Sequence, residues 1–239
     1  GMRMQPADAG RLVLASEQHS LRIDGQPLPV LRTRTPVVVA AHKPRGMAVV
    51  LSAGERDSRF REWLVAISAA LSEGGIGREL SPVGRLDKAT TGLLLLTDDG
   101  DLDLALRDSS TLLKAYVAVV GADAATAHAA STRLLAGVPL PDGEARAMDV
   151  LVMGSSEELE AAAQQPGLAG LAAISLPGAP AAAAPAGGGA RAAVLLRLSD
   201  GRNRVVRRML AAAGLPCLFL HRLAYGPLDL AALDLAAPG

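Results

Sequence analysis

A polar loop that runs directly into four consecutive leucines sets the strongest limit on how this chain can fold. Residues 81–92 are polar and include Gly84 and Gly92, and Leu93 to Leu96 follow them without a break. A short apolar run that follows turn-forming residues is typical of a buried strand. The sequence therefore predicts a sheet in which a polar loop leads into a buried strand.

Strand-like and helix-like segments follow one another irregularly along the rest of the chain. Alternating or apolar runs predict further strands at 37–41, 47–51, 116–120, 194–198 and 218–220. The first two of these are close enough to pair as a hairpin. Amphipathic spacing predicts helices at 58–72, 126–136 and 202–213, with a short one after Asp101. Because no regular βα repeat connects these segments, the expected fold class is α+β.

Composition divides the chain into parts. Residues 1–36 are polar and poorly periodic, which indicates an N-terminal extension, and residues 37–239 are expected to form the main domain. Within that domain, residues 154–189 are rich in Ala, Gly and Pro. Such a composition is typical of a flexible surface insertion.

Several classes of site have no support in the sequence. Cys217 is the single cysteine, so an intrachain disulfide is excluded, and the four histidines show no zinc-site spacing; a cytoplasmic protein is expected. No apolar run reaches the roughly 20 residues of a membrane span. The glycines at 74–77 lack the third glycine of a dinucleotide fingerprint, and no Walker motif occurs. Neither a cofactor nor a metal is expected.

Charge is distributed unevenly. The formal net charge is zero, which by itself argues against a nucleic-acid partner. Residues 191–225, however, contain seven arginines and one acidic residue, Asp200. This segment is basic enough to contact phosphates.

Four ordered motifs resemble those of pseudouridine synthases. Residues 84–87, with 89–97 after them, match the family signature nearly residue for residue. The other three motifs are typical of the Rsu-type ribosomal-RNA branch: Lys43-Pro44, Lys114 with Tyr116, and the arginine-rich run 202–209. The resemblance covers about residues 37–230. It implies a mixed, largely antiparallel sheet flanked by helices, with an active cleft across its middle.

The resemblance also implies an activity, an RNA pseudouridine synthase (an isomerase), and roles for three residues. Asp87 matches the family nucleophile, and Tyr116 matches the tyrosine that stacks on the target uracil. Arg207 matches the basic partner that keeps the carboxylate ionised. Each has a simpler explanation when taken alone: a turn aspartate, a half-buried strand tyrosine and an arginine on a solvated helix face.

Contacts to RNA are implied as well. Arg85 would fill the space that a flipped uridine leaves, and the other implied RNA contacts are Lys43, Arg202, Arg204 and Arg208. The expected partner is ribosomal RNA or a ribosomal subunit precursor, bound by a monomer. Residues 1–36 are too few for the S4 RNA-binding domain, so the chain resembles the branch without one.

Two other functions compete with this hypothesis. The first is a non-catalytic RNA-binding protein on the same fold, which would use only the basic segment. The second is a phosphatase of the haloacid dehalogenase type, which needs magnesium and a second acid two positions after its nucleophile. Here that position is Ala89.

Overall fold

The computed structural model describes residues 22–23, 26–27, 35–50, 59–73, 78–165, 168, 171, 190–230 and 233. The chain divides into two units, 1–36 and 37–239. In the first unit, β1 (Arg22–Ile23) pairs with β2 (Gln26–Pro27) in an antiparallel ribbon. All other described helices and strands belong to the second unit.

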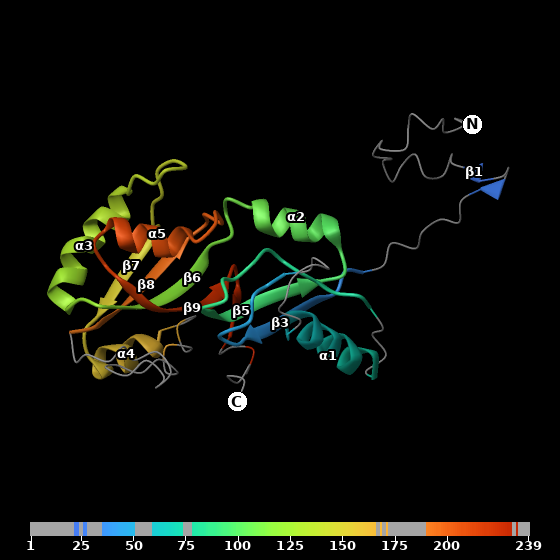
Figure 1. Ribbon diagram of the computed structural model, residues 1–239, viewed down its shortest axis with the longest axis horizontal. Helices are drawn as coiled ribbons and strands as arrows, with labels where there is room; N and C mark the ends of the chain where they lie inside the picture. The colour runs from blue at the N-terminus through green and yellow to red at the C-terminus, as the bar shows by residue number, and fades with distance from the viewer. Residues whose placement is uncertain are drawn as a thin grey trace. The chain divides into compact units, whose positions relative to one another are not determined.

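An eight-stranded mixed sheet forms the centre of the second unit (Figure 1). Its strands are β3 (Val38–Lys43), β4 (Ser81–Pro82), β5 (Thr90–Thr97), β6 (Lys114–Val120), β7 (Asp149–Met153), β8 (Ala192–Leu198), β9 (Cys217–Tyr225) and β10 (Leu228–Asp229). The order is β3-β5-β9-β6-β8-β7, with β4 beside β5 and β10 beside β9. Among the described pairs, β5 with β9 is parallel and the rest are antiparallel. The expected α+β fold with a largely antiparallel sheet is confirmed.

Five described helices cover both faces of this sheet. They are α1 (Arg59–Glu73), α2 (Gly100–Asp108), α3 (Ala124–Ala136), α4 (Ser156–Ala163) and α5 (Val205–Ala212). Successive residues of a strand point to opposite faces. In β6, Ala118 and Val120 therefore pack with α3 and α5, whereas Val117 and Val119 pack with α4 (Figure 1). None of the described helices has the length and apolar character needed to cross a membrane.

The four leucines of β5 are buried because both faces of this strand are covered. Leu94 and Leu96 belong to the core that contains Phe60 and Leu64 of α1, and Leu93 and Leu95 pack with residues of α2 and β10. All four are at most 1% exposed. The apolar run thus contributes to two cores at once, as its continuous pattern predicts.

Two strand predictions need correction. Residues 47–50 form no strand, and β3 pairs with β5 instead of with this segment, while residue 51 lies outside the described residues. Met47 and Val49 are buried in the core that contains Phe60 and Leu64 of α1. Their alternating apolar pattern therefore reflects packing against this helix and not a strand. The strand predicted at 218–220 extends from Cys217 to Tyr225 because His221 and Arg222 are buried in spite of their polarity.

The segment predicted as a flexible insertion begins with an ordered helix. Ser155 and Glu158 form a reciprocal capping box at the start of α4. Leu159, Ala162 and Ala163 of this helix are buried against the sheet. The segment expected to be a flexible insertion thus contains a helix at 156–163, and residues 166–167, 169–170 and 172–189 lie outside the described residues.

Candidate active site

Asp87 lies on the loop between β4 and β5. Val83 and Leu86 bury their side chains in the two cores that flank β5, and Val83 N donates to Leu95 O at 2.8 Å. Thr90 N donates to Asp87 O at 3.0 Å, which closes the loop just before the strand. With Leu86 turned inward, Arg85 is exposed and the Asp87 side chain keeps 23% exposure. The carboxylate is therefore fixed in place but open to a ligand.

Gly92 lets the two parallel strands approach each other beneath this loop. Its φ of +107° lies in the region that favours glycine, and it pairs with Arg222 of β9. A Cβ atom here would lie 2.2 Å from the Arg222 carbonyl oxygen. No other residue fits at this position without moving β5 away from β9.

Two arginines at the start of α5 face Asp87. Arg204 Nη1 lies 3.4 Å and Arg207 Nε lies 3.6 Å from Asp87 Oδ2. Arg207 is 13% exposed and also reaches Ala89 O and Thr90 Oγ1, each at 3.4 Å, whereas Arg204 is 53% exposed. These separations are long for hydrogen bonds, so the attraction is mainly between charges. Two positive charges therefore lie next to the Asp87 carboxylate.

Arg204 has an unusual backbone. Its φ of 51° is left-handed, and no other non-glycine residue in the described part of the chain has a positive φ. Such a conformation costs about 1 to 2 kcal/mol and persists when neighbouring contacts impose it. The contacts of Arg202 and Arg208, on either side of Arg204, supply that constraint.

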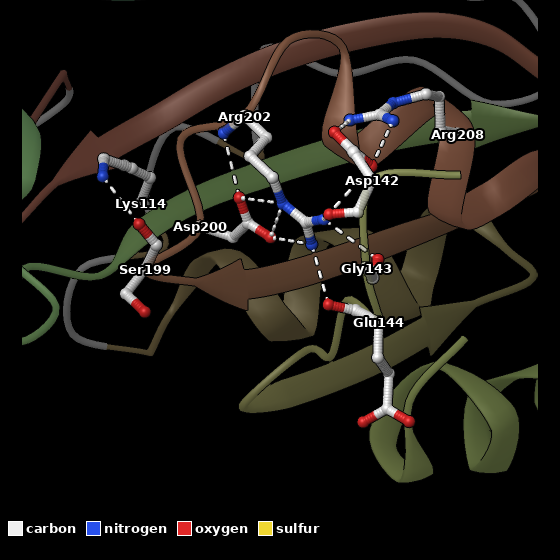
Figure 2. Close-up of polar contacts among 8 residues, drawn as sticks. All are labelled: Lys114, Asp142, Gly143, Glu144, Ser199, Asp200, Arg202 and Arg208. Carbon is white, nitrogen blue, oxygen red and sulfur yellow. Dashed lines mark hydrogen bonds and ion pairs between the residues drawn. The ribbon is translucent and has the colours of Figure 1, made fainter. Parts of the chain in front are cut away.

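Arg202 and Arg208 bind protein groups (Figure 2). Arg208 forms a bidentate pair with Asp142 at 2.6 and 2.9 Å, which holds the pKa of the Asp142 carboxyl below its usual value. Arg202 reaches Asp142 O at 2.7 Å, Gly143 O at 2.9 Å, Glu144 O at 2.8 Å and the Asp200 carboxylate at 2.7 Å. Their donors join the 142–144 turn to the start of α5, and the expectation that Arg202 and Arg208 contact phosphates stays a prediction.

Tyr116 stands on β6, across β9 from the Asp87 loop. It lines the same hollow, of about 60 Å³, as Asp87, Arg204 and Arg207. Arg222 Nη1 donates to Tyr116 Oη at 3.5 Å, and its guanidinium carbon lies 6.0 Å from the centre of the tyrosine ring. No sequence motif pointed to Arg222, although an arginine inside an apolar strand segment indicates a buried charge that needs polar partners.

Lys43 does not reach the surface, so its expected contact with RNA is wrong. Its side chain is 0% exposed, and Nζ donates to Pro44 O and Thr90 O, each at 2.8 Å. Burial lowers the pKa of Lys43 to about 8, although the Asp87 charge acts in the opposite direction. Lys43 thus ties the end of β3 to the first residue of β5 beneath the Asp87 loop.

Arg85 lies where three adjoining hollows meet. It lines the Asp87 hollow, an open groove of about 730 Å³ and a third hollow of about 390 Å³. Its side chain is exposed and makes no hydrogen bond or ion pair to any residue that the structure describes. Within the same described part, no three His, Cys, Asp or Glu side chains come together as a metal site would require.

The family model for RNA pseudouridylate synthases matches residues 37–212, which include the loop, both arginines and the tyrosine of this site. The chain belongs to this family. An uncharacterized RNA pseudouridine synthase of Mycobacterium leprae is 31% identical over 211 residues, which are 88% of this chain and 66% of that protein. The chain therefore spans slightly less than two thirds of that relative's length.

A second relative and a solved structure extend the likeness to other pseudouridylate synthases. Ribosomal large subunit pseudouridine synthase E of Xanthomonas campestris is 33% identical over 199 residues, which are 83% of this chain and 91% of that protein. A crystal structure of a pseudouridylate synthase superimposes with a TM-score of 0.50 at 20% identity, covering 90% of this chain and 81% of the other. That structure supports the pseudouridylate synthase fold alone.

Proposed function

We propose that this chain is an RNA pseudouridine synthase that acts on a uridine of large-subunit ribosomal RNA, with Asp87 as its nucleophile. The observation that carries the proposal is the single hollow shared by Asp87, Arg204, Arg207 and Tyr116, inside the region that the family model matches. The ribosomal substrate is suggested by the name of the Xanthomonas relative.

The reaction exchanges one bond to the ribose for another. The bond between uracil N1 and C1′ breaks, the uracil turns within the site, and C5 joins C1′; C5 loses a proton and N1 gains one. Atoms and electrons balance without an oxidant or an external energy source. The Asp87 carboxylate acts either as a nucleophile at the ribose or by assisting uracil departure through an elimination.

The neighbouring side chains have separate tasks in this proposal. Arg207 holds the Asp87 carboxylate beside the reacting nucleotide, and Tyr116 supports the uracil ring and takes part in the transfer of the C5 proton. The uridine must leave its stack first, which costs a few kcal/mol. Arg85 is exposed at the junction of the hollows and would occupy the vacated space.

The proposal is tested by tritium release from ribosomal RNA labelled at uridine C5. We expect release by the native chain and a loss of at least about a thousandfold in Asp87→Asn, because this change removes the nucleophilic charge with little change in volume. Asp101→Asn, an exposed change on α2, is the matched control and should retain full activity.

Two outcomes would contradict the proposal. Normal turnover by Asp87→Asn would exclude Asp87 as the nucleophile. No release by the native chain, on free RNA and on subunit precursors, would favour the second candidate, a non-catalytic RNA-binding protein that uses the basic start of α5.

A further inference from the structure

A second hollow adjoins the Asp87 site and is lined by positive charge. Its volume is about 390 Å³, and it shares Arg85, Tyr116, Gly201 and Arg202 with the Asp87 hollow. Its charged lining has one acidic residue, Asp108, and five cationic residues: Arg85, Arg107, Lys114, Arg202 and Arg222. We call it the cation pocket.

Two of these cations are buried next to each other. Lys114 of β6 is 4% exposed and Arg222 of β9 is 3% exposed. Lys114 Nζ and the Arg222 guanidinium carbon each lie 5.2 Å from the centre of the Tyr225 ring. Burial, and then the charge of Arg222, lower the pKa of Lys114. The two charges are therefore close enough to repel each other.

No carboxylate forms an ion pair with either cation within the part of the chain that the structure describes. Lys114 Nζ donates to Ser199 O at 2.8 Å, and neither Lys114 nor Arg222 forms an ion pair with a described residue. Asp200, the acid that acts on Lys114, is already paired with Arg202 at 2.7 Å.

Arg222 also has an unused donor. Its Nε donates to Leu93 O at 2.6 Å and its Nη1 reaches Tyr116, but Nη2 is buried without a partner. Burying a charge without a counter-charge is unfavourable, because the charge loses its hydration. Two buried cations and an unpaired donor beside an open hollow would favour the binding of an anion there.

We propose that the cation pocket binds a phosphodiester group of the RNA, next to the nucleotide whose base contacts Tyr116. This inference rests on the proposed function, because it assumes an RNA substrate. Phosphate oxygens accept charge-assisted hydrogen bonds from ammonium and guanidinium groups. Since Tyr116 and Arg85 line both hollows, a phosphate in the cation pocket would be close to the target uridine.

The first test uses inorganic phosphate as the probe and thermal unfolding as the readout. Phosphate should raise the Tm of the native chain above its value in sodium chloride of equal ionic strength, because a ligand of the folded state stabilises it. Lys114→Met should lose at least half of this rise. Arg61→Gln, an exposed change on α1 that removes the same charge, should keep it.

Lys114→Met is expected to fold, so a lost phosphate response would not be caused by unfolding. Removal of one of two buried like charges should leave the Tm without phosphate unchanged or higher. Lys114→Arg keeps the charge and should keep the phosphate response, so it serves as the second variant if Lys114→Met does not fold. An equal phosphate response in the native chain and Lys114→Met, or a lost response in Lys114→Arg, would overturn the proposal.

The second test measures RNA affinity at several potassium chloride concentrations. Lys114→Met should lower the slope of log Kd against log salt by about 0.7 to 0.9, the change expected for one lost phosphate contact. Arg61→Gln should leave the slope unchanged. Turnover is measured on the same preparations. If the native chain is active but Lys114→Met has the same salt slope, the phosphate site is excluded and the proposed function stands. If the native chain is inactive, the proposed function is excluded, and the salt slopes still show whether the pocket contacts a phosphate.

Discussion

Lys43 is a buried lysine that joins β3 to β5, and its effect on the free energy of unfolding at different pH values can be predicted. Its pKa is about 8 in the folded chain and about 10.5 when unfolded. Between these values the unfolded chain binds more protons, so the free energy of unfolding rises with pH across this window. Below pH 8 both states are protonated and the penalty of burying the charge is fully present.

We therefore expect the native chain to gain stability relative to Lys43→Met as the pH rises from 7.5 to 10.5. The gain should be about 2 kcal/mol, after allowance for solvent screening. Urea unfolding of both proteins at several pH values measures it. Parallel stability curves for the two would show that Lys43 does not titrate in this window.

Arg204 and Arg207 both place a positive charge near Asp87, but they differ in exposure to solvent. Arg207 is 13% exposed and Arg204 is 53% exposed, so solvent screens the second far more. We expect Arg207→Met to lower the single-turnover rate about a hundredfold, and Arg204→Met to lower it less than about tenfold while weakening RNA binding. Equal losses of rate would contradict the distinction between the two residues.

In the sheet, Gly92 determines how closely strands β5 and β9 approach each other. Gly92→Ala would place a Cβ 2.2 Å from the Arg222 carbonyl oxygen, at a φ of +107°. Strain and overpacking together should lower the free energy of unfolding by about 2 to 4 kcal/mol, which thermal unfolding can measure. Gly100→Ala is the control, because nothing lies within 4 Å of its added Cβ. Equal stability of the two variants would mean that the strands can move apart without cost.

The turn that holds Asp142 clamps the start of α5. Asp142→Ala removes the bidentate partner of Arg208 and one contact of Arg202, and should lower the free energy of unfolding. Because the clamp supports the backbone of Arg204, the variant should also turn over more slowly without binding RNA more weakly. Asp149→Asn, whose partner is Arg197 at 3.3 Å, is the exposed control. Weaker RNA binding by Asp142→Ala would mean that the clamp itself shapes the RNA surface.

Local patterns predicted some elements better than others, for physical reasons. The helix at 58–72 is α1 within one residue at each end, because a periodic amphipathic pattern carries its own signal. The extent of β9 was missed, since burial of His221 depends on Thr91, whose hydroxyl lies 2.7 Å from Nδ1. A contact between residues so far apart in sequence leaves no local trace.

For the whole molecule, the site joins segments from distant parts of the chain. The motifs predicted that Asp87, Tyr116 and Arg207 belong together, and the structure brings them to one hollow; their roles stay predictions. The partners of the other basic residues were not predictable, because neither Asp142 nor the carbonyl of Thr90 belongs to a basic motif. Whether an arginine faces phosphate or a carboxylate depends on a fold that its own segment does not encode.

The position of β9 has a consequence for synthesis of the protein on the ribosome. This strand lies between β5 and β6 in the sheet, although it is among the last segments of the chain to be made. Until residues 217–225 emerge, the half of the sheet that carries Asp87 has no strand to join it to the half that carries Tyr116. In nascent chains that stop before β9, the half with Asp87 and the half with Tyr116 should therefore remain unpaired. Activity should appear only once translation has passed Tyr225.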